Sequence, residues 1–93
     1  MVIGLLTLDL HIPQSRSLKD KRQVVRRLIA RVRGRFNVSI AEVADHDLHQ
    51  RAAIAIVSVN TDRDHLESTL RAVADEAEKD RDAQVLRADT EVL

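Results

Sequence analysis

The sequence predicts an α+β fold in which a four-stranded antiparallel sheet carries two helices on one face. Apolar residues dominate segments 2–12 and 51–60, as is typical of the two central strands of a sheet. Segment 18–35 and the segment after Asp62 instead repeat apolar residues at helical spacing. With shorter strand patterns at 36–44 and 84–92, the order becomes strand, helix, strand, strand, helix, strand. Two right-handed strand–helix–strand units in this order predict a ferredoxin-like βαββαβ sandwich.

The 93 residues predict a single domain, residues 1–93, because no linker, repeat or low-complexity segment divides them. Hydrophobic residues make up 44% of the chain, which is enough for one two-layer core and argues against disorder. Phe36 is the one aromatic residue. The core must therefore consist of Leu, Val, Ile and Ala.

The first strand, 2–12, has one apolar face and one mixed face. The apolar face consists of Val2, Leu6, Leu8, Leu10 and Ile12. The mixed face consists of Ile3, Leu5, Thr7, Asp9 and His11. A strand of this kind suits the middle of a sheet.

The first helix is predicted from Ser17 to about Arg35. Ser17 is a good N-cap residue, and Asp20 stands where a carboxylate can complete a weak capping box. Gly34 is a plausible C-terminal stop. The apolar stripe that follows the cap consists of Leu18, Val25, Leu28, Ile29 and Val32.

The remaining elements follow the same logic. Segment 36–44 predicts a strand, 45–49 a polar turn, and 51–60 a strand that is apolar on both faces and therefore central. Thr61 and Asp64 resemble the capping box of a second helix, and 84–92 predicts the last strand. The second helix has an acidic C-terminal end, which the helix dipole disfavours, so these acids are expected to pair with the basic helix. They are Asp75, Glu76, Glu78, Asp80 and Asp82.

The charge is unevenly distributed although the net charge is zero. Residues 1–36 carry nine basic and two acidic side chains, whereas residues 37–93 carry six basic and thirteen acidic ones. This division predicts a basic face and an acidic face. Three interpretations stay open: intramolecular pairing between the two helices, a polyanionic partner, and head-to-tail self-association.

The basic face is centred on the first helix. Helical spacing places Lys19, Arg22, Arg26 and Arg33 in one stripe beside the apolar face. Lys21 falls inside the apolar arc, so it must extend to solvent, find a carboxylate, or face a ligand. If nucleic acid is bound, phosphate contacts must dominate, because the chain lacks aromatics for stacking bases on the sheet. The candidate nucleic-acid-binding residues are Arg16, Lys19, Lys21, Arg22, Arg26 and Arg33, with Arg51 nearby at best.

The sheet face opposite the helices is predicted to be uncovered. Ile3, Leu5 and alternate residues of 52–59 would place apolar side chains there. Exposed apolar patches often mark interfaces, so a homo-oligomer through this face or a sheet edge is expected. Small side chains such as Ala53 and Ala55 could instead leave the face without a partner.

Other chemistry finds weak support. Asp45, His46, Asp47 and His49 could share a metal ion, but polar loops produce such clusters by chance, so no metal or cofactor is predicted. There is no cysteine, no nucleophile–base pair and no phosphate-binding glycine loop. The sequence therefore predicts a non-enzymatic protein.

The apolar start is interrupted at Asp9 and lacks a basic flank, so neither a signal peptide nor a membrane span is predicted, and we expect a cytoplasmic protein.

The sequence resembles the YlxP-like family, a small bacterial family of unknown function. The resemblance runs through residues 2–6, 11–13, 15–22, 35–39, 41–43 and 47–52. Its most specific segments are Ser17-Leu18-Lys19-Asp20-Lys21-Arg22 and Arg35-Phe36-Asn37-Val38-Ser39. The family's usual tryptophan is His49 here, which removes an aromatic platform. The resemblance implies a ferredoxin-like fold, no established activity, and genes near those of a translation initiation factor and ribosome-binding factor A.

These observations support two hypotheses. The first is an accessory factor that binds structured RNA or the ribosome through the basic helix. The alternative is a self-associating or protein-binding module that uses the uncovered sheet face.

Overall fold

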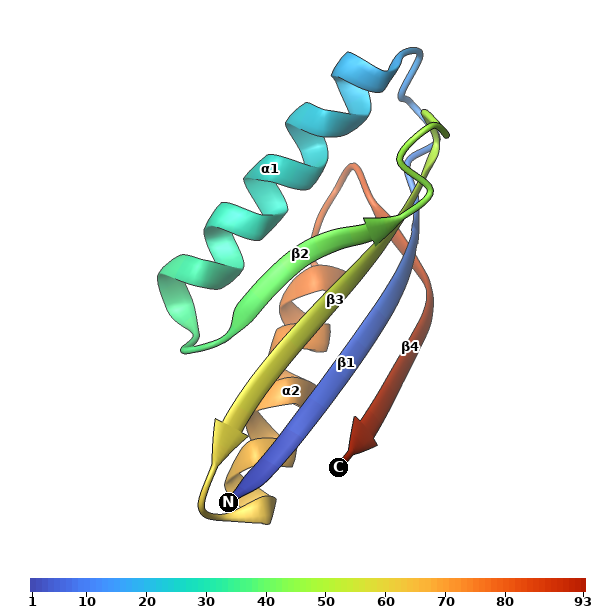
Figure 1. The fold of residues 1–93 in the computed structure, drawn as a ribbon. Helices are drawn as coiled ribbons and strands as arrows, with labels where there is room; N and C mark the ends of the chain where they lie inside the picture. The colour runs from blue at the N-terminus through green and yellow to red at the C-terminus, as the bar shows by residue number, and fades with distance from the viewer.

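A computed structural model describes all of residues 1–93 as a two-layer sandwich (Figure 1). The strands and helices follow one another in the predicted order: strand, helix, strand, strand, helix, strand. The bounds of the elements are β1 Val2–His11, α1 Leu18–Arg35, β2 Ser39–Ala44, β3 Arg51–Asn60, α2 Arg63–Glu78 and β4 Gln84–Val92.

The four strands form one antiparallel sheet in the order β2-β3-β1-β4. β1 and β3 are therefore central, which confirms the prediction made from their apolar sequences. Val2 lies opposite Asn60 and Gly4 opposite Val92, so both chain termini lie at one end of the sheet (Figure 1). The turns that lead into α1 and connect β2 to β3 lie at the other end.

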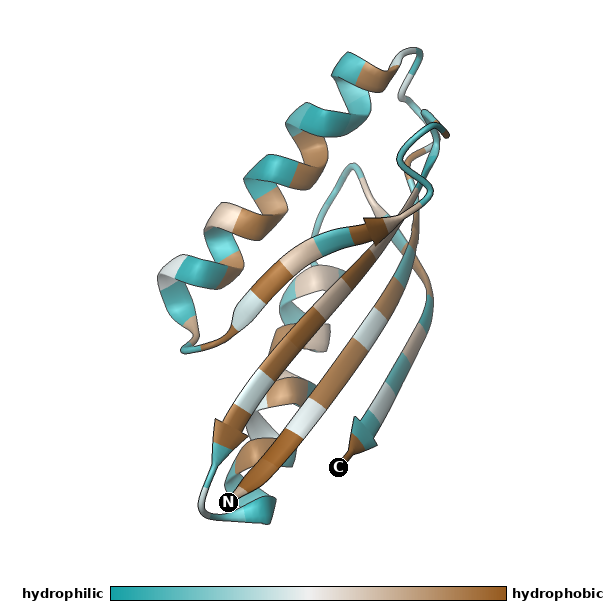
Figure 2. Ribbon diagram, in the orientation of Figure 1, coloured by the Kyte–Doolittle hydropathy of each residue, from teal (hydrophilic) through white to brown (hydrophobic).

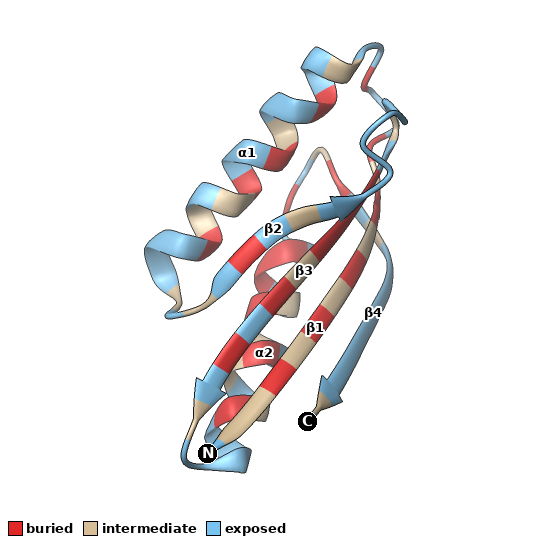
Figure 3. Cartoon of the chain, viewed as in Figure 1, coloured by how far each residue is buried: buried red, intermediate tan, exposed pale blue.

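Both helices pack on the same face of the sheet around one hydrophobic core. Hydrophobic, buried residues of β1 and β3 belong to one core cluster with apolar residues of α1 and α2. Figure 2 shows where the hydrophobic residues lie along these elements, and Figure 3 shows buried positions alternating along β1. The most deeply buried core residues include Leu6, Ile54, Ile56, Leu66 and Leu70. The ferredoxin-like α+β arrangement is thus confirmed. Neither helix has the length and apolar composition that crossing a bilayer requires.

Helix α1 ends at Arg35, as predicted, but three details of the predicted element ends are wrong. Gly34 lies inside α1 and is not its stop: the helix continues to Arg35, where Arg35 Nη1 donates to Glu76 Oε2 at 2.8 Å, and Phe36 is the C-cap. As a consequence, β2 begins at Ser39 instead of residue 36. Helix α2 is capped by Asp62, whose carboxylate accepts from two backbone N–H groups, and not by Thr61.

Candidate nucleic-acid interface

The start of α1 is held rigidly by hydrogen bonds from its own loop. Ser17 Oγ accepts from the Asp20 N–H at 3.0 Å, so Ser17 is the N-cap that the sequence predicts. The Asp20 carboxylate accepts from the Arg16 N–H at 2.9 Å instead of from the N–H of the cap itself. The Ser15 hydroxyl is buried and donates to the Ser17 carbonyl at 2.9 Å. The backbone that carries Arg16 and Lys19 is therefore fixed.

A side chain from the β2–β3 connection ties this loop to the sheet. Gln50 Nε2 donates to the carbonyls of Pro13 at 3.2 Å and Ser15 at 3.1 Å. The Gln50 carbonyl in turn accepts from the Ile12 N–H at 2.8 Å. The sequence pattern does not reveal this role of Gln50, because a lone polar residue before a strand has no motif that shows its partner. The contacts of Gln50 hold Arg51, the next residue, at the same end of the molecule as Arg16.

The structure separates the nine basic residues of segment 16–35 into three groups. One group faces α2 and consists of Arg27, Arg31 and Arg35. A second group is engaged by β2 and the turn after it, and consists of Lys21 and Arg33. The third group is exposed and forms no ion pair, and consists of Arg16, Lys19, Arg22 and Arg26.

The arginines that face α2 pair with acids at its C-terminal end and in the turn after it. Arg27 Nη2 lies 3.2 Å from Asp80 Oδ1, and Arg31 Nη2 lies 3.3 Å from the same oxygen. Arg35 Nη1 lies 2.8 Å from Glu76 Oε2. Both carboxylates are buried, at 1% and 8% of side-chain exposure. The expected pairing of the basic helix with these acids is therefore confirmed for these three arginines.

The pairing changes the proton affinities of both partners. Burial alone would raise the pKa of Asp80, but hydrogen bonds from the Asp82 N–H and the Arg27 guanidinium outweigh it, and the Arg27 charge and the Ala83 N–H add to them. The pKa of Asp80 is therefore lowered. Burial alone would lower the pKa of Arg27, but the carboxylates of Asp80 and Asp82 raise it. Arg27 is consequently a fixed structural cation.

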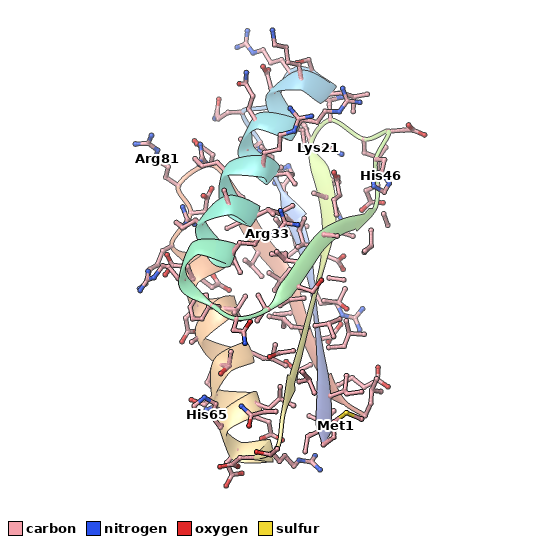
Figure 4. All side chains as sticks on the ribbon, turned by 60° about the vertical axis from the view of Figure 1, so that its left-hand side comes forward. Met1, Lys21, Arg33, His46, His65 and Arg81 are labelled. Carbon is pink, nitrogen blue, oxygen red and sulfur yellow. The ribbon has the colours of Figure 1, made fainter.

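Lys21 is a structural residue and cannot contact an external phosphate, in contrast to its predicted role. Only 1% of its side chain is exposed. Its Nζ lies 3.0 Å from Glu42 Oε2 and donates to the Asp45 carbonyl at 2.8 Å and the His46 carbonyl at 3.4 Å. Asp45 has a φ of 64°, so Lys21 stabilises a turn in the left-handed region. Figure 4 shows Lys21 and His46 at the same end of the molecule.

Arg33 is partly engaged by the sheet. Its Nη2 donates to the Ile40 carbonyl of β2 at 3.2 Å (Figure 4). The residue nevertheless remains exposed. The contact leaves Arg33 less free than the four unpaired cations to reach a ligand.

The four unpaired cations form what we call the basic flank: Arg16, Lys19, Arg22 and Arg26. Lys19, Arg22 and Arg26 are separated by three and four residues, so they lie along one side of α1. This side is turned away from the side that carries Arg27 and Arg31, and therefore away from the acidic end of α2. The basic flank is a cationic surface that no carboxylate of the chain neutralises.

The uncovered sheet face has a small apolar area at one end. Ile3 lies opposite Val59 and Leu5 opposite Val57, and the two valines are 59% and 41% exposed. Towards the other end this face becomes polar, because His11 lies opposite Arg51 and its Nδ1 lies 3.3 Å from Gln84 Oε1.

The metal hypothesis finds no suitable geometry. No three histidine, cysteine, aspartate or glutamate residues come together in a group that could hold a metal ion. The loop residues proposed for it, Asp45, His46, Asp47 and His49, are exposed. The backbone carbonyls of Asp45 and His46 accept hydrogen bonds from Lys21 Nζ.

Comparisons with known proteins agree with the fold and supply no activity. Residues 3–90 match a family described as "Protein of unknown function (DUF503)". The uncharacterised protein YlxP of Bacillus subtilis is 38% identical over 72 residues, covering 77% of this chain and 78% of YlxP. A REP-associated tyrosine transposase bound to a REP hairpin is similar in structure, with a TM-score of 0.51 and 18% identity. The similarity covers 98% of this chain but 55% of the transposase, so it extends to the fold alone.

Proposed function

Since the chain belongs to the DUF503 family of proteins of unknown function, we propose from its geometry that it is a non-enzymatic factor that binds structured RNA, free or within the ribosome. The basic flank of α1 would contact the phosphates. Arg51, at the same end of the molecule, would extend this surface. Lys21 would support the surface from below without touching the RNA.

A single observation carries this proposal: the chain has enough carboxylates to neutralise α1 and leaves one side of it unpaired. The acidic end of α2 pairs with Arg27, Arg31 and Arg35 on the other side. A solvated helix face usually mixes both signs of charge, whereas the basic flank contains cations alone. Asp20, the one acid of α1, lies outside the flank, and its carboxylate accepts from the Arg16 N–H. Such a surface fits a polyanion.

Phosphate contact is the mode of recognition that these residues favour. Arginine and lysine spaced along one side of a helix can follow the backbone of a nucleic acid, which fixes orientation without reading sequence. The chain has no exposed aromatic platform for bases, because Phe36 is its one aromatic residue and packs against the core. We therefore expect recognition by shape and charge.

The decisive experiment compares two triple charge reversals in binding to ribosomal subunits and total RNA. The first variant is Lys19→Glu, Arg22→Glu, Arg26→Glu. The control variant is Arg63→Glu, Arg71→Glu, Arg81→Glu, which changes the net charge by the same amount on α2 and the turn after it. Both are checked for folding by circular dichroism.

We expect the first variant to lose binding and the control to keep most of it, since the contact is local to α1. Binding by the native protein should weaken steeply with added salt. Equal loss in the two variants would mean that only net charge matters, and unchanged binding in the first would refute the proposal.

A second candidate function, self-association or protein binding, is supported by the exposed Val57 and Val59 on the uncovered sheet face. They adjoin Ile3 and Leu5 across the β1–β3 pair. The apolar area is limited, because Thr7, Asp9 and charged residues of β4 share the face. Replacing Val59 by Lys should abolish association if this face is the interface, as light scattering can show.

A further inference from the structure

Strand β4 is a long edge strand of the sheet, with a bulge at Leu86 where its pairing with β1 shifts register. It is nine residues long and pairs with β1 on one side only. Figure 3 shows it exposed along nearly its whole length. Proteins usually shield long edges, because unpaired backbone groups recruit other strands. The opposite edge, β2, is only six residues long, and Arg33 Nη2 donates a hydrogen bond to its Ile40 carbonyl.

The hydrogen-bond pattern shows which groups of β4 point outwards. The Leu93 N–H donates to the Ile3 carbonyl at 2.8 Å, so residue 93 exchanges its bonds with β1. Hydrogen-bonded and non-hydrogen-bonded pairs alternate along an antiparallel ladder. The backbone N–H and C=O groups of Ala88, Thr90 and Val92 therefore face away from β1 and have no partner.

The side chains beside this edge also leave room for a neighbour. Ala88 and Thr90 lie on the helix side of the sheet, opposite the buried Leu8 and Leu6, and yet both are exposed. A groove of about 390 Å³ separates β4 from α2. Its lining includes Leu6, Ala74, Ala88, Thr90, Val92 and Arg71.

We propose that β4 pairs with β4 of a second copy, antiparallel, about a two-fold axis through Ala88. The pairing would place Arg87 of each copy opposite Asp89 of the other, and these two side chains already form an ion pair within one strand. An axis through Asp89 would oppose two aspartates, and an axis through Thr90 would oppose Asp89 and Glu91. Ala88 is thus the centre that produces only attractive charged pairs near the axis.

The ladder between the copies would cover residues 86–90 of each β4, because the bulge at Leu86 shifts the register of the residues before it. It would join the two sheets edge to edge, with two α2 grooves flanking the axis. The basic flank would remain free, because α1 packs against β2 at the opposite edge of the sheet. The inference is therefore independent of the proposed RNA binding. If both hold, each dimer presents two basic flanks.

Sedimentation velocity over a range of protein concentrations tests the dimer. The native chain should sediment as a dimer. Thr90→Pro removes an outward N–H without touching the β1 ladder, so it should give a folded monomer. Arg87→Asp and Asp89→Arg should each give monomers through repulsion, and the double variant Arg87→Asp, Asp89→Arg should restore the dimer.

A matched control, Arg81→Asp, changes the same charge outside the edge and should leave the dimer intact, since its side chain is 89% exposed in the turn before β4. A native chain that stays monomeric at the highest concentration would overturn the proposal. So would a dimer that survives both single charge variants. These two charge variants keep the test decisive if Thr90→Pro does not fold.

Discussion

Lys21 and Glu42 form an ion pair that joins the first turn of α1 to the edge strand β2. The Nζ and Oε2 atoms are 3.0 Å apart, and only 1% and 15% of the two side chains are exposed. The same ammonium group bonds the carbonyls of Asp45 and His46, so one lysine connects the helix, the strand and the turn after it. The start of the basic flank therefore depends on a residue that no ligand can reach.

We expect Lys21→Ala to lower the free energy of unfolding by about 3 kcal/mol, because it leaves Glu42 charged and largely buried without its partner. Urea unfolding measures this loss. Lys19→Ala is the control, and its exposed side chain should change stability by less than about 0.5 kcal/mol. The double variant Lys21→Met, Glu42→Leu should recover much of the stability. A loss no greater than that of Lys19→Ala would contradict the role assigned to the pair.

The two glycines of the chain should respond to alanine with opposite signs. A Cβ at Gly4 would lie 2.7 Å from Leu70 Cδ1 and 3.0 Å from Leu66 Cδ2, where α2 packs on β1. Gly4→Ala should therefore destabilise the protein by about 1–3 kcal/mol through overpacking. A Cβ at Gly34 meets nothing within 4 Å, and Gly34 lies inside α1. Gly34→Ala should stabilise by about 0.5–1 kcal/mol.

Thermal and urea unfolding of both variants provide the measurement. Equal effects in the two variants would show that α2 does not approach β1 as closely as described, or that Leu66 and Leu70 move aside without cost.

The element order and the central strands could be predicted because they depend on hydrophobic periodicity, which is local. The apolar runs of β1 and β3 are long enough to identify buried strands directly. Gly34 does not stop α1, because its cost inside a helix is small and the Arg35–Glu76 contact favours helix beyond it. That contact joins residues far apart in the sequence.

The candidate site could be predicted only in part for the same reason. Helical spacing correctly places Lys19, Arg22 and Arg26 on one side of α1. It also identifies Lys21 as an anomaly inside the apolar arc, but Glu42 lies on another strand and no pattern connects the two. Which arginines remain unpaired depends on how α2 lies against α1, and only the three-dimensional structure shows this.

The Asp80 carboxylate should make stability depend on acid. Its pKa is lowered in the folded state, so its contribution is present above the unfolded pKa of about 3.9 and is lost as the pH falls through the folded value. We expect Asp80→Asn to destabilise the protein most near neutral pH. The difference from the native chain should shrink below about pH 4.

Urea unfolding between about pH 7 and about pH 2.5 measures this trend. Asp75→Asn is the control, because Asp75 lies near the end of α2, five residues before Asp80, is exposed and forms no ion pair. A difference between native protein and Asp80→Asn that stays constant with pH would show that the Asp80 contacts act through packing and not through charge.

The salt dependence of RNA binding should count the cations of the basic flank. Each phosphate contact contributes roughly −0.7 to −0.9 to the slope of log affinity against log salt concentration. Four contacts, one for each cation of the basic flank, therefore predict a slope of about −3. Arg22→Ala should make the slope less steep by nearly one contact. Arg63→Ala, on α2, removes the same charge and should leave the slope unchanged, since Arg63 pairs with Glu67 at 2.9 Å. Filter binding or fluorescence anisotropy at several salt concentrations gives both slopes, and equal slopes for the two variants would argue against contact through α1.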